Sequence, residues 1–305
     1  MIKDLGADDP VTVGPYRLIG RLGRGGMGRV YLARSPGGRT VAVKVIRPEF
    51  AANREFRARF AREVAAVRNV SGVFTAAVID ADPEAKLPWL ATAYVPGPSL
   101  AEAVETQGPL PVLSVLRLAA GLAEGLQAIH AVGLVHRDLK PSNVLLAPDG
   151  PRLIDFGIAA AREASKLTRV GEVIGSPGFF SPEHALGEVV DASSDVFSLG
   201  AVLAFAATGE GPFGEGSMPA VVHRVVYSPP ALSRLPSDLL PLIIGCLAKK
   251  RADRPSTGEL LARLSGSVAA AAPPVSAVAQ WPATGGRYTP TAVNLRVVPT
   301  PPAGA

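Results

Sequence analysis

Cysteine is nearly absent from this sequence: Cys246 is the only one among its 305 residues. One cysteine permits no internal disulfide, and this favours a reducing compartment. Its neighbours Ile243, Ile244 and Leu247 are apolar, which predicts a buried thiol rather than a reactive one. We therefore expect a cytoplasmic protein.

Long hydrophobic runs are also lacking. Residues 1–10 carry acids and no apolar core, so we expect no signal peptide there. The longest apolar run, Val196–Ala207, is too short to cross a bilayer and predicts a buried core helix. The sequence thus predicts a chain without a membrane span.

A strong excess of charge is missing as well. The formal net charge is +5, and the arginines at 54–68 lie among helix-spaced phenylalanines without the aromatic interleaving of a nucleic-acid surface. This pattern indicates a solvated helix face. We expect no nucleic-acid partner.

What the sequence does contain is a polar stretch, His136–Asn143, with apolar residues on both sides. Asp138 is suited to orient a hydroxyl and accept its proton, and Lys140 carries a charge that can hold a transferring phosphoryl group. The amide oxygen of Asn143 suits a hard cation such as Mg²⁺. Pro141 discourages a helix, so we expect a loop between short buried strands.

A glycine-rich segment, Gly23–Gly28, has the spacing G-x-G-x-x-G. Glycine is required where side chains would keep backbone amides away from phosphates. Dinucleotide-binding strand–loop–helix units use the same spacing, and they are the alternative for this motif taken alone. No helix-forming run follows Gly28, and the turn at 35–38 favours a β-hairpin that covers phosphates.

Hydrophobic periodicity predicts the elements around these motifs. We expect strands over 40–46, 73–80 and 89–95, and helices over 53–68, 99–105 and 111–131. In the first of these helices, Phe56, Phe60, Val64 and Val67 form one apolar face with Glu63 beside it. Residues 1–15 are polar and are interpreted as a leader. The Ala/Pro-rich residues 266–305 are interpreted as a flexible tail.

Further motifs follow along the chain in a fixed order. These further motifs are Val41–Lys44, Asp155–Gly157, Ser181–Glu183, Asp195–Gly200 and Arg254, and they add to the two segments above. In this order, over residues 16 to about 265, the sequence resembles the bacterial eukaryotic-like (Hanks-type) serine/threonine protein kinases, and its glycine segment is similar to that of actinobacterial members. The resemblance implies an α+β, bilobal fold. Residues 16–95 would form a small, β-rich N-lobe with one regulatory helix, and 96–265 a larger, mostly helical C-lobe.

The resemblance also implies ATP and Mg²⁺, or Mn²⁺ in its place, as cofactors. The implied catalytic residues are Asp138, Lys140, Lys44 and Glu63, and the implied metal ligands are Asn143 and Asp155. Glu63 would pair with Lys44, and Glu55, two turns earlier, is the alternative partner. The implied nucleotide contacts are Leu22, Gly23, Arg24, Gly25, Gly26, Met27, Gly28, Val30, Ala42, Lys44, Thr92, Ala93, Val95 and Leu145.

The same resemblance implies a regulatory phosphorylation site and two structural contacts. Thr168 would be phosphorylated, and Arg137, with Arg162 or Arg59, would hold its phosphate. Val170 stands where many bacterial relatives carry a second phosphorylatable threonine. Glu183 and Arg254 would form a buried bridge. Asp195 would cap its own helix or, as the resemblance implies, bond the backbone of the catalytic loop.

The implied reaction transfers the γ-phosphoryl group of ATP to serine or threonine hydroxyls of proteins, with autophosphorylation in the activation segment. The implied partners are ATP and protein substrates, and a dimer of kinase domains is allowed. A pseudokinase that only binds ATP is the first alternative, although Lys44, Asp138 and Asp155 are all present. A small-molecule phosphotransferase is the second, although such proteins generally lack the lysine two residues after the aspartate.

Overall fold

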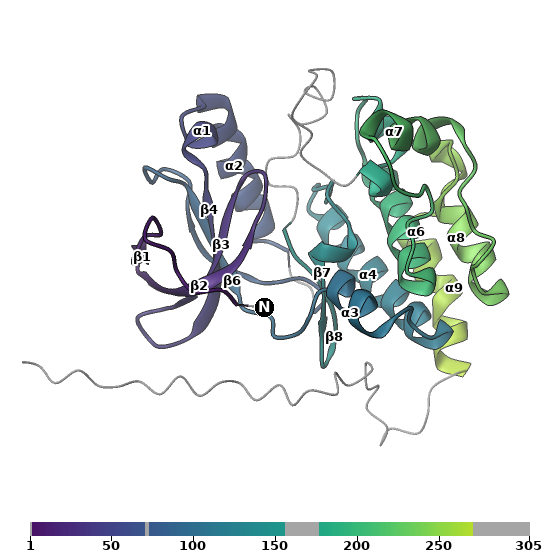
Figure 1. Cartoon of the computed structure of the whole chain (residues 1–305), viewed down its shortest axis with the longest axis horizontal. Helices are drawn as coiled ribbons and strands as arrows, with labels where there is room; N and C mark the ends of the chain where they lie inside the picture. The colour runs from purple at the N-terminus through teal and green to yellow at the C-terminus, as the bar shows by residue number, and fades with distance from the viewer. Residues whose placement is uncertain (1, 71–72, 156–176, 271–305) are drawn as a thin grey trace, which may run out of the picture.

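The chain folds into a small sheet-containing lobe and a larger helical lobe, which lie side by side (Figure 1). This computed structural model describes residues 2–70, 73–155 and 177–270, with side chains described to residue 265. The expected α+β, bilobal fold is confirmed. The predicted residues Phe156, Gly157, Arg162 and Thr168 lie outside the described part of the chain.

The small lobe is built on a six-stranded antiparallel sheet with the order β1-β2-β3-β4-β6-β5. The hairpin β2–β3 carries the glycine-rich segment at its tip, and β4 pairs with both β3 and β6. The strands are β1 (Thr12–Val13), β2 (Tyr16–Arg24), β3 (Gly28–Arg34), β4 (Thr40–Ile46), β5 (Val78–Asp82) and β6 (Trp89–Ala93).

Strand β4 shows how the sheet divides an outer face from an inner one. Val41, Val43 and Val45 are buried in a cluster with Tyr31 and Trp89 on the outer face. Ala42 and Lys44, which alternate with the valines, are only partly buried and point to the inner face. The inner face is therefore the one that leaves room for a ligand.

Helix α2 (Arg54–Val67) lies against the sheet, preceded by the short helix α1 (Pro48–Ala51). Asn53 caps α2, because its side-chain oxygen accepts a hydrogen bond from the amide of Phe56. The apolar face predicted for this helix is buried. The periodicity thus identified the helix and its packing face correctly.

The N-terminal residues differ from the expected leader. Residues 2–13, here called the N-terminal strap, pack against the sheet instead of extending from it. Lys3 and Arg21 exchange two backbone hydrogen bonds of 2.9 and 2.7 Å, and β1 pairs with β2. Val13 is buried in the outer cluster. A polar composition concealed this docking, because backbone pairing with β2 requires no apolar side chains.

The strand expected over 73–80 is also different. The strand β5 begins only at Val78, and the preceding residues contact the large lobe. The amide of Ala76 donates to the carbonyl of Leu153 at 3.1 Å, and the amide of Leu153 donates to the carbonyl of Phe74 at 2.8 Å. The apolar alternation there reflects a backbone link between the lobes, not one continuous strand.

The large lobe packs its helices around α4 and α6, with the hairpin β7–β8 on the side of the small lobe (Figure 1). Its helices are α3 (Leu100–Gln107), α4 (Val112–Ala131), α5 (Pro182–Ala185), α6 (Ala192–Thr208), α7 (Met218–Tyr227), α8 (Leu240–Cys246) and α9 (Thr257–Ala270), with 3₁₀ turns at Pro141–Asn143, Pro177–Phe179, Ser237–Leu239 and Arg251–Asp253. The hairpin consists of β7 (Val144–Ala147) and β8 (Gly150–Leu153).

Two apolar helices form the centre of this lobe. α6 is buried along most of its length, as predicted for the run at Val196–Ala207. Among the described helices, α4 is long and apolar enough to cross a membrane, but half of its apolar window is buried inside the lobe, as in a core helix. Cys246 is fully buried, and burial raises the pKa of its thiol to about 12. The thiol is therefore inert, as predicted.

Candidate active site

Two side chains of the polar stretch, those of Lys140 and Asn143, converge on the carboxylate of a third, Asp138. Lys140 Nζ lies 2.9 and 2.8 Å from the two carboxylate oxygens of Asp138. The amide nitrogen of Asn143 donates to the backbone oxygen of Asp138 at 2.8 Å and to its Oδ2 at 2.9 Å. The carboxylate is about one-third exposed, so a substrate hydroxyl can reach it. Asp138 is thus held as an oriented acceptor beside a cation.

The loop that carries Asp138 is fixed from below by Asp195 of α6. This buried carboxylate accepts hydrogen bonds from the amides of His136 and Arg137 at 2.8 and 2.9 Å. His130 Nε2 lies 2.8 Å from the same carboxylate. Arg137 has a left-handed backbone conformation, with φ of +64°. The hydrogen bonds from the amides of His136 and Arg137 to Asp195 stabilise this conformation. Of the two roles expected for Asp195, the structure shows the bond to the loop backbone. The cap of α6 is Asp191 instead.

His136 and His130 have structural positions. His136 is fully buried, and burial lowers the pKa of its imidazole. The contact between His130 and Asp195 is one that sequence analysis missed. The sequence holds no signal for it, since the two residues lie 65 positions apart.

The hairpin β7–β8 brings Asn143 and Asp155 to the same end of the site. The two strands pair from Val144 with Leu153, and the amide of Ile154 donates to the carbonyl of Asn143 at 3.0 Å. Asp155 follows directly, in a left-handed conformation with φ of +54°. The predicted convergence of these two residues follows from that register.

The oxygens of this pair fit a magnesium ion. Asn143 bonds Asp138 through its amide nitrogen, so its side-chain carbonyl oxygen takes no part in that contact. Asp155 offers a carboxylate that is about one-third exposed. Within the described residues no cluster of three or more His, Cys, Asp or Glu side chains could hold a metal. A bound Mg²⁺ would need phosphate oxygens and water to complete its shell.

Lys44 and Glu63 do not form the expected ion pair. Lys44 Nζ instead lies 3.0 Å from Asp155 Oδ1. Glu63 Oε1 lies 3.8 Å from Arg137 Nη1, and Glu63 Oε2 is buried without a hydrogen-bond partner among the described residues. The helix and the glutamate face were predicted correctly, but periodicity cannot determine how far a helix stands from the sheet. The expected pairing is therefore wrong for this arrangement.

The electrostatics of Glu63 follow from its surroundings. Its side chain is 12% exposed. Burial raises the pKa of this carboxyl to about 7, although Arg137, Arg59 and Arg62 act in the opposite direction. Arg59 Nε and Nη2 are likewise buried without hydrogen-bond partners among the described residues. The cluster is thus under-satisfied, and its polar groups are available for new partners.

The glycine-rich tip of the β2–β3 hairpin leaves space on its surface. A Cβ added to Gly23 or Gly25 would meet no protein atom within 4 Å, and neither residue has a positive φ. Neither packing nor backbone conformation therefore requires glycine there, whereas a closely approaching ligand does. Gly28 is different, because a Cβ there would collide with the carbonyl oxygen of Val45.

The other predicted nucleotide residues line the inner face below this tip. Val30 pairs with Lys44, and Ala42 pairs with Thr92, so the three strands present these side chains together. The amide of Ala93, at the end of β6, donates a hydrogen bond to the carbonyl of Ala77 at 2.8 Å. The partly buried residues of this surface are Leu22, Met27, Val30, Ala42, Lys44, Thr92, Ala93, Val95 and Leu145, whereas Gly23, Arg24 and Gly25 are exposed.

The predicted bridge between Glu183 and Arg254 is present. Two hydrogen bonds of 2.6 and 2.9 Å join the guanidinium to the carboxylate, and Ser194 Oγ adds a third at 2.5 Å. Burial acts to raise the pKa of Glu183, but the hydrogen bonds from Arg254 and Ser194 outweigh it and lower the pKa to about 2. The bridge anchors the chain that leads away from residues 156–176.

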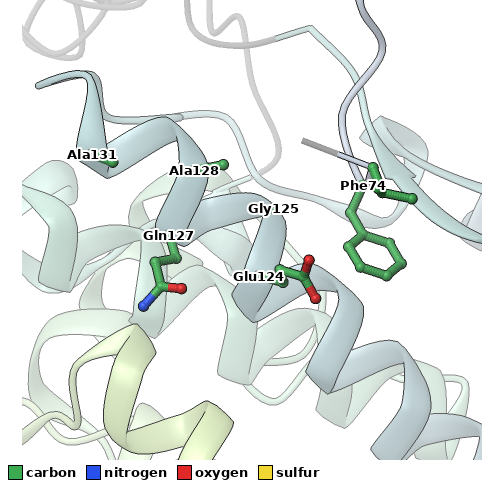
Figure 2. Close-up of a pocket in the computed structure, with 7 residues that line it drawn as sticks. Phe74, Glu124, Gly125, Gln127, Ala128 and Ala131 are labelled. Atoms are coloured by element: carbon green, nitrogen blue, oxygen red, sulfur yellow. The ribbon is translucent and has the colours of Figure 1, made fainter. Parts of the chain in front are cut away.

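A separate hollow lies away from these residues, between α4 and the segment that carries Phe74 (Figure 2). Its cavity volume is about 320 Å³, and Glu124 is its charged lining residue. None of the predicted site residues lines it. The predicted site residues lie instead between the inner face of the small lobe and the end of the hairpin β7–β8, where Lys44 contacts Asp155, and this region is called the cleft below.

Comparison with known proteins agrees with this geometry. The family model of the protein kinase domain matches residues 16–264. The chain is 57% identical over 265 residues to the probable serine/threonine-protein kinase PkwA of Thermomonospora curvata, covering 87% of this chain and 36% of the relative. It is 52% identical over 266 residues to the serine/threonine-protein kinase AfsK of Streptomyces coelicolor, with 87% and 33% covered.

A solved structure with the same fold is the kinase domain of PknI from Mycobacterium tuberculosis. The TM-score is 0.68 at 30% identity, and the match covers 85% of this chain and 98% of that one. The chain spans about a third of the length of the two curated relatives above.

Proposed function

This chain belongs to the protein kinase family, and we propose that it transfers the γ-phosphoryl group of ATP to serine or threonine hydroxyls of proteins. The observation that supports this most is the arrangement around Asp138, where Lys140 and Asn143 both hold one accessible carboxylate. We propose residues 16–265 as the catalytic unit, with the N-terminal strap attached to it.

The proposed roles follow the geometry. Asp138 orients the acceptor hydroxyl and takes its proton, while the new bond from that oxygen to phosphorus forms in line with the breaking bond to ADP. Lys140 lies beside Asp138 and balances the charge of the moving phosphoryl group. Mg²⁺, or Mn²⁺ in its place, held by Asn143 and Asp155, would neutralise the phosphate charge.

The nucleotide is proposed to lie on the inner face of the small lobe. The backbone of Gly23–Gly28 would cover the phosphates, because its exposed glycines put no side chain in the way. Val30 and Ala42 would contact the base from one side and Leu145 from the other. The carbonyl of Ala93 and the backbone of Val95 would bond its edge, and Lys44 would bind phosphate oxygens.

A direct test uses two substitutions in the purified chain with labelled ATP, Mg²⁺ and a protein substrate. Asp138→Asn is expected to lower the rate by about 10³-fold, within the range of general-base catalysis, and Lys44→Met to abolish measurable transfer. Asp149→Asn, an exposed aspartate in the β7–β8 turn, is the matched control and keeps full activity. Undiminished transfer by either variant contradicts the assignment.

The same experiment separates the alternatives. ATP-dependent thermal stabilisation without any transfer would identify a binding module, and transfer to small molecules but not to proteins would identify a metabolite phosphotransferase. The presence of Lys44, Asp138 and Asp155 favours an active kinase over the binding module, and Lys140, two residues after Asp138, favours a protein kinase over the metabolite phosphotransferase.

We further propose that Thr168 is the regulatory phosphorylation site. A phosphate there would draw Arg137 away from Glu63, with Arg59 as a second ligand, because both arginines lie beside that weakly bonded carboxylate. Glu63 would then be free to pair with Lys44, as in the expected catalytic arrangement. Mass spectrometry of active enzyme should find Thr168 modified, and active enzyme with an unmodified Thr168 overturns the proposal.

The role of Glu63 has its own control. Glu63→Gln is expected to lower the transfer rate by about tenfold or more, since Lys44 loses its expected partner. Glu55→Gln, on the exposed start of the same helix, should leave the rate within about twofold. Equal effects of the two substitutions would show that Glu55 serves as well as Glu63.

Three further proposals concern the location, the substrates and the oligomeric state of the chain. We propose a cytoplasmic location, where ATP is available and where the buried thiol of Cys246 stays reduced. Serine- or threonine-containing proteins are the proposed substrates. A dimer of kinase domains is a prediction that the solution mass of the chain would test.

A further inference from the structure

Asp9 of the N-terminal strap is a charged side chain completely enclosed by the protein. Its side chain is 0% exposed, although the strap lies on the surface. Four donors surround the carboxylate: Arg21 Nε, Arg29 Nη1 at 2.9 Å, the hydroxyl of Tyr31 at 2.8 Å and the amide of Gly6 at 2.8 Å. A buried carboxylate with this many donors is fully satisfied.

The donors come from both strands of the hairpin that carries the glycine-rich tip. Arg21 belongs to β2, and Arg29 and Tyr31 belong to β3. Arg21 and Tyr31 face each other in the strand register. Arg21 precedes Gly23 by two residues, and Arg29 directly follows Gly28. Asp9 thus links the two strands just below the tip.

The strand pairing is irregular where this link occurs. The register between β2 and β3 shifts between Arg21 and Gly23. Such a bulge interrupts the ladder of backbone hydrogen bonds and increases the local twist. Asp9 supplies a connection between the strands that the backbone does not provide there.

The positive charges of Arg21 and Arg29 require a negatively charged carboxylate at Asp9. The guanidinium groups of Arg21 and Arg29 both contact Asp9 and are each about one-third exposed. Without a negative charge between them, two cations on neighbouring strands would repel each other. A neutral amide at this position could not balance them.

The link lies on the outer face of the sheet, opposite the cleft. Tyr31 is buried in the outer cluster, whereas Val30 and Lys44 face inward. Asp9 therefore cannot touch a nucleotide bound on the inner face. It acts on the hairpin from behind, and it lies outside residues 16–264, which the family model covers.

We propose that Asp9 is a positioning residue for nucleotide binding, which sets the twist of the β2–β3 hairpin and hence the position of Gly23–Gly28 over the phosphates. This inference rests on the proposed function, because it assumes that ATP binds under the glycine-rich tip. It assigns a role in the nucleotide site to Asp9, although Asp9 binds the outer face of the sheet.

The test compares the full chain with Asp9→Asn and with Asp8→Asn, which removes the same charge from the adjacent exposed side chain. Asp9→Asn is expected to raise the KM for ATP and the Kd for MgATP about tenfold, with the KM for a protein substrate within twofold of wild type. Asp8→Asn should leave all three values within twofold. Hydrogen exchange at residues 22–30 should be faster in Asp9→Asn alone.

A milder substitution keeps the test decisive if Asp9→Asn does not fold. Tyr31→Phe removes one of the four hydrogen bonds and should raise the KM for ATP two- to threefold, as expected from about one lost hydrogen bond partly transmitted to the site. Again the KM for the protein substrate should not change. Equal shifts in both KM values would indicate a general loss of structure and overturn the positioning role.

The outcomes also distinguish this inference from the proposed function. If the wild-type chain binds no MgATP, the proposed function fails. If the wild type binds MgATP and Asp9→Asn binds it equally well, the nucleotide site stands and the positioning role is wrong.

Discussion

Two glutamate–arginine pairs in this chain have the same chemistry and opposite properties. Glu183 and Arg254 are 3% and 0% exposed and share hydrogen bonds of 2.6 and 2.9 Å. Glu63 and Arg137 are separated by 3.8 Å, and one oxygen of Glu63 has no hydrogen-bond partner among the described residues. The pKa of the first glutamate is lowered to about 2, and that of the second is raised to about 7.

The difference lies in how many donors surround each carboxylate. Arg254 also donates to the carbonyls of Ala248, Ser193 and Lys249, so its whole guanidinium is held in one orientation. Glu63 is desolvated but receives no such set of bonds. Burial with full hydrogen bonding fixes a charged pair, whereas burial without it leaves a pair that can exchange partners. The first arrangement suits an anchor and the second suits a switch.

The largest effect is expected from Arg254→Ala, because it leaves Glu183 buried without its counter-charge. We expect a loss of about 3–5 kcal/mol in the free energy of unfolding. Denaturant titration monitored by circular dichroism measures it. A loss below about 1 kcal/mol would mean that the anchor is no stronger than a surface pair.

The second prediction concerns the pH dependence of Glu63. Its folded-state pKa of about 7 lies above the usual value of 4.5, so its protonation contributes stability below pH 4.5 that is lost as the pH rises through 7. Relative to wild type, Glu63→Gln should therefore become more stable by about 1–3 kcal/mol between pH 5 and pH 8. Thermal unfolding at both pH values gives the answer, and a constant difference would show that Glu63 stays ionised.

The contribution of Glu183 to the free energy of unfolding should change with pH in the opposite direction, and at lower pH. The folded-state pKa of Glu183 is lowered, so its contribution is present above pH 4.5 and is lost as the pH falls toward 2. Glu183 thus supports the fold at neutral pH, where Glu63 weakens it.

A smaller effect is expected from Ser194→Ala. The hydroxyl donates to Glu183 at 2.5 Å, and a hydrogen bond to a charged group contributes about 1.5–3 kcal/mol. We expect a loss near the lower end, because Arg254 stays in place. Combining Ser194→Ala with Arg254→Ala in a double-mutant cycle should give non-additive losses, whereas additive losses would contradict a shared network.

The smallest effect is expected from Arg251→Ala, the control for Arg254. Arg251 lies 3.9 Å from Glu183 and also contacts Glu188 and Asp191, but its side chain is 33% exposed. Solvent screens such contacts, so the loss should stay below about 1 kcal/mol. A loss as large as that of Arg254→Ala would remove the distinction between anchor and surface pair.

The anchor could be predicted from the sequence and the switch could not. Glu183 and Arg254 each lie in a motif that the family resemblance identifies, and the resemblance implied their pairing. The structure confirms it. Glu63 was placed on the correct helix and beside its apolar face. Its partner depends on how the helix sits against the sheet and on Arg137, and neither is encoded in helical periodicity.

The fold shows the same division. The family, the two lobes and the face of α2 were predictable, because long periodic segments and ordered motifs carry them. The strap and the late start of the strand expected over 73–80 were not, because backbone hydrogen bonds to distant residues define them. Asp9 looked like one more polar residue in an acidic leader, and only the arginines on two neighbouring strands give it significance.

The link from Phe74 and Ala76 to Leu153 gives the molecule a second joint. The chain at 94–98 connects the lobes covalently, and this pair of backbone hydrogen bonds connects them again, in addition to the Lys44–Asp155 and Glu63–Arg137 contacts. Since Leu153 is two residues from Asp155, this link ties the segment before β5 directly to the strand that leads into the proposed metal ligand.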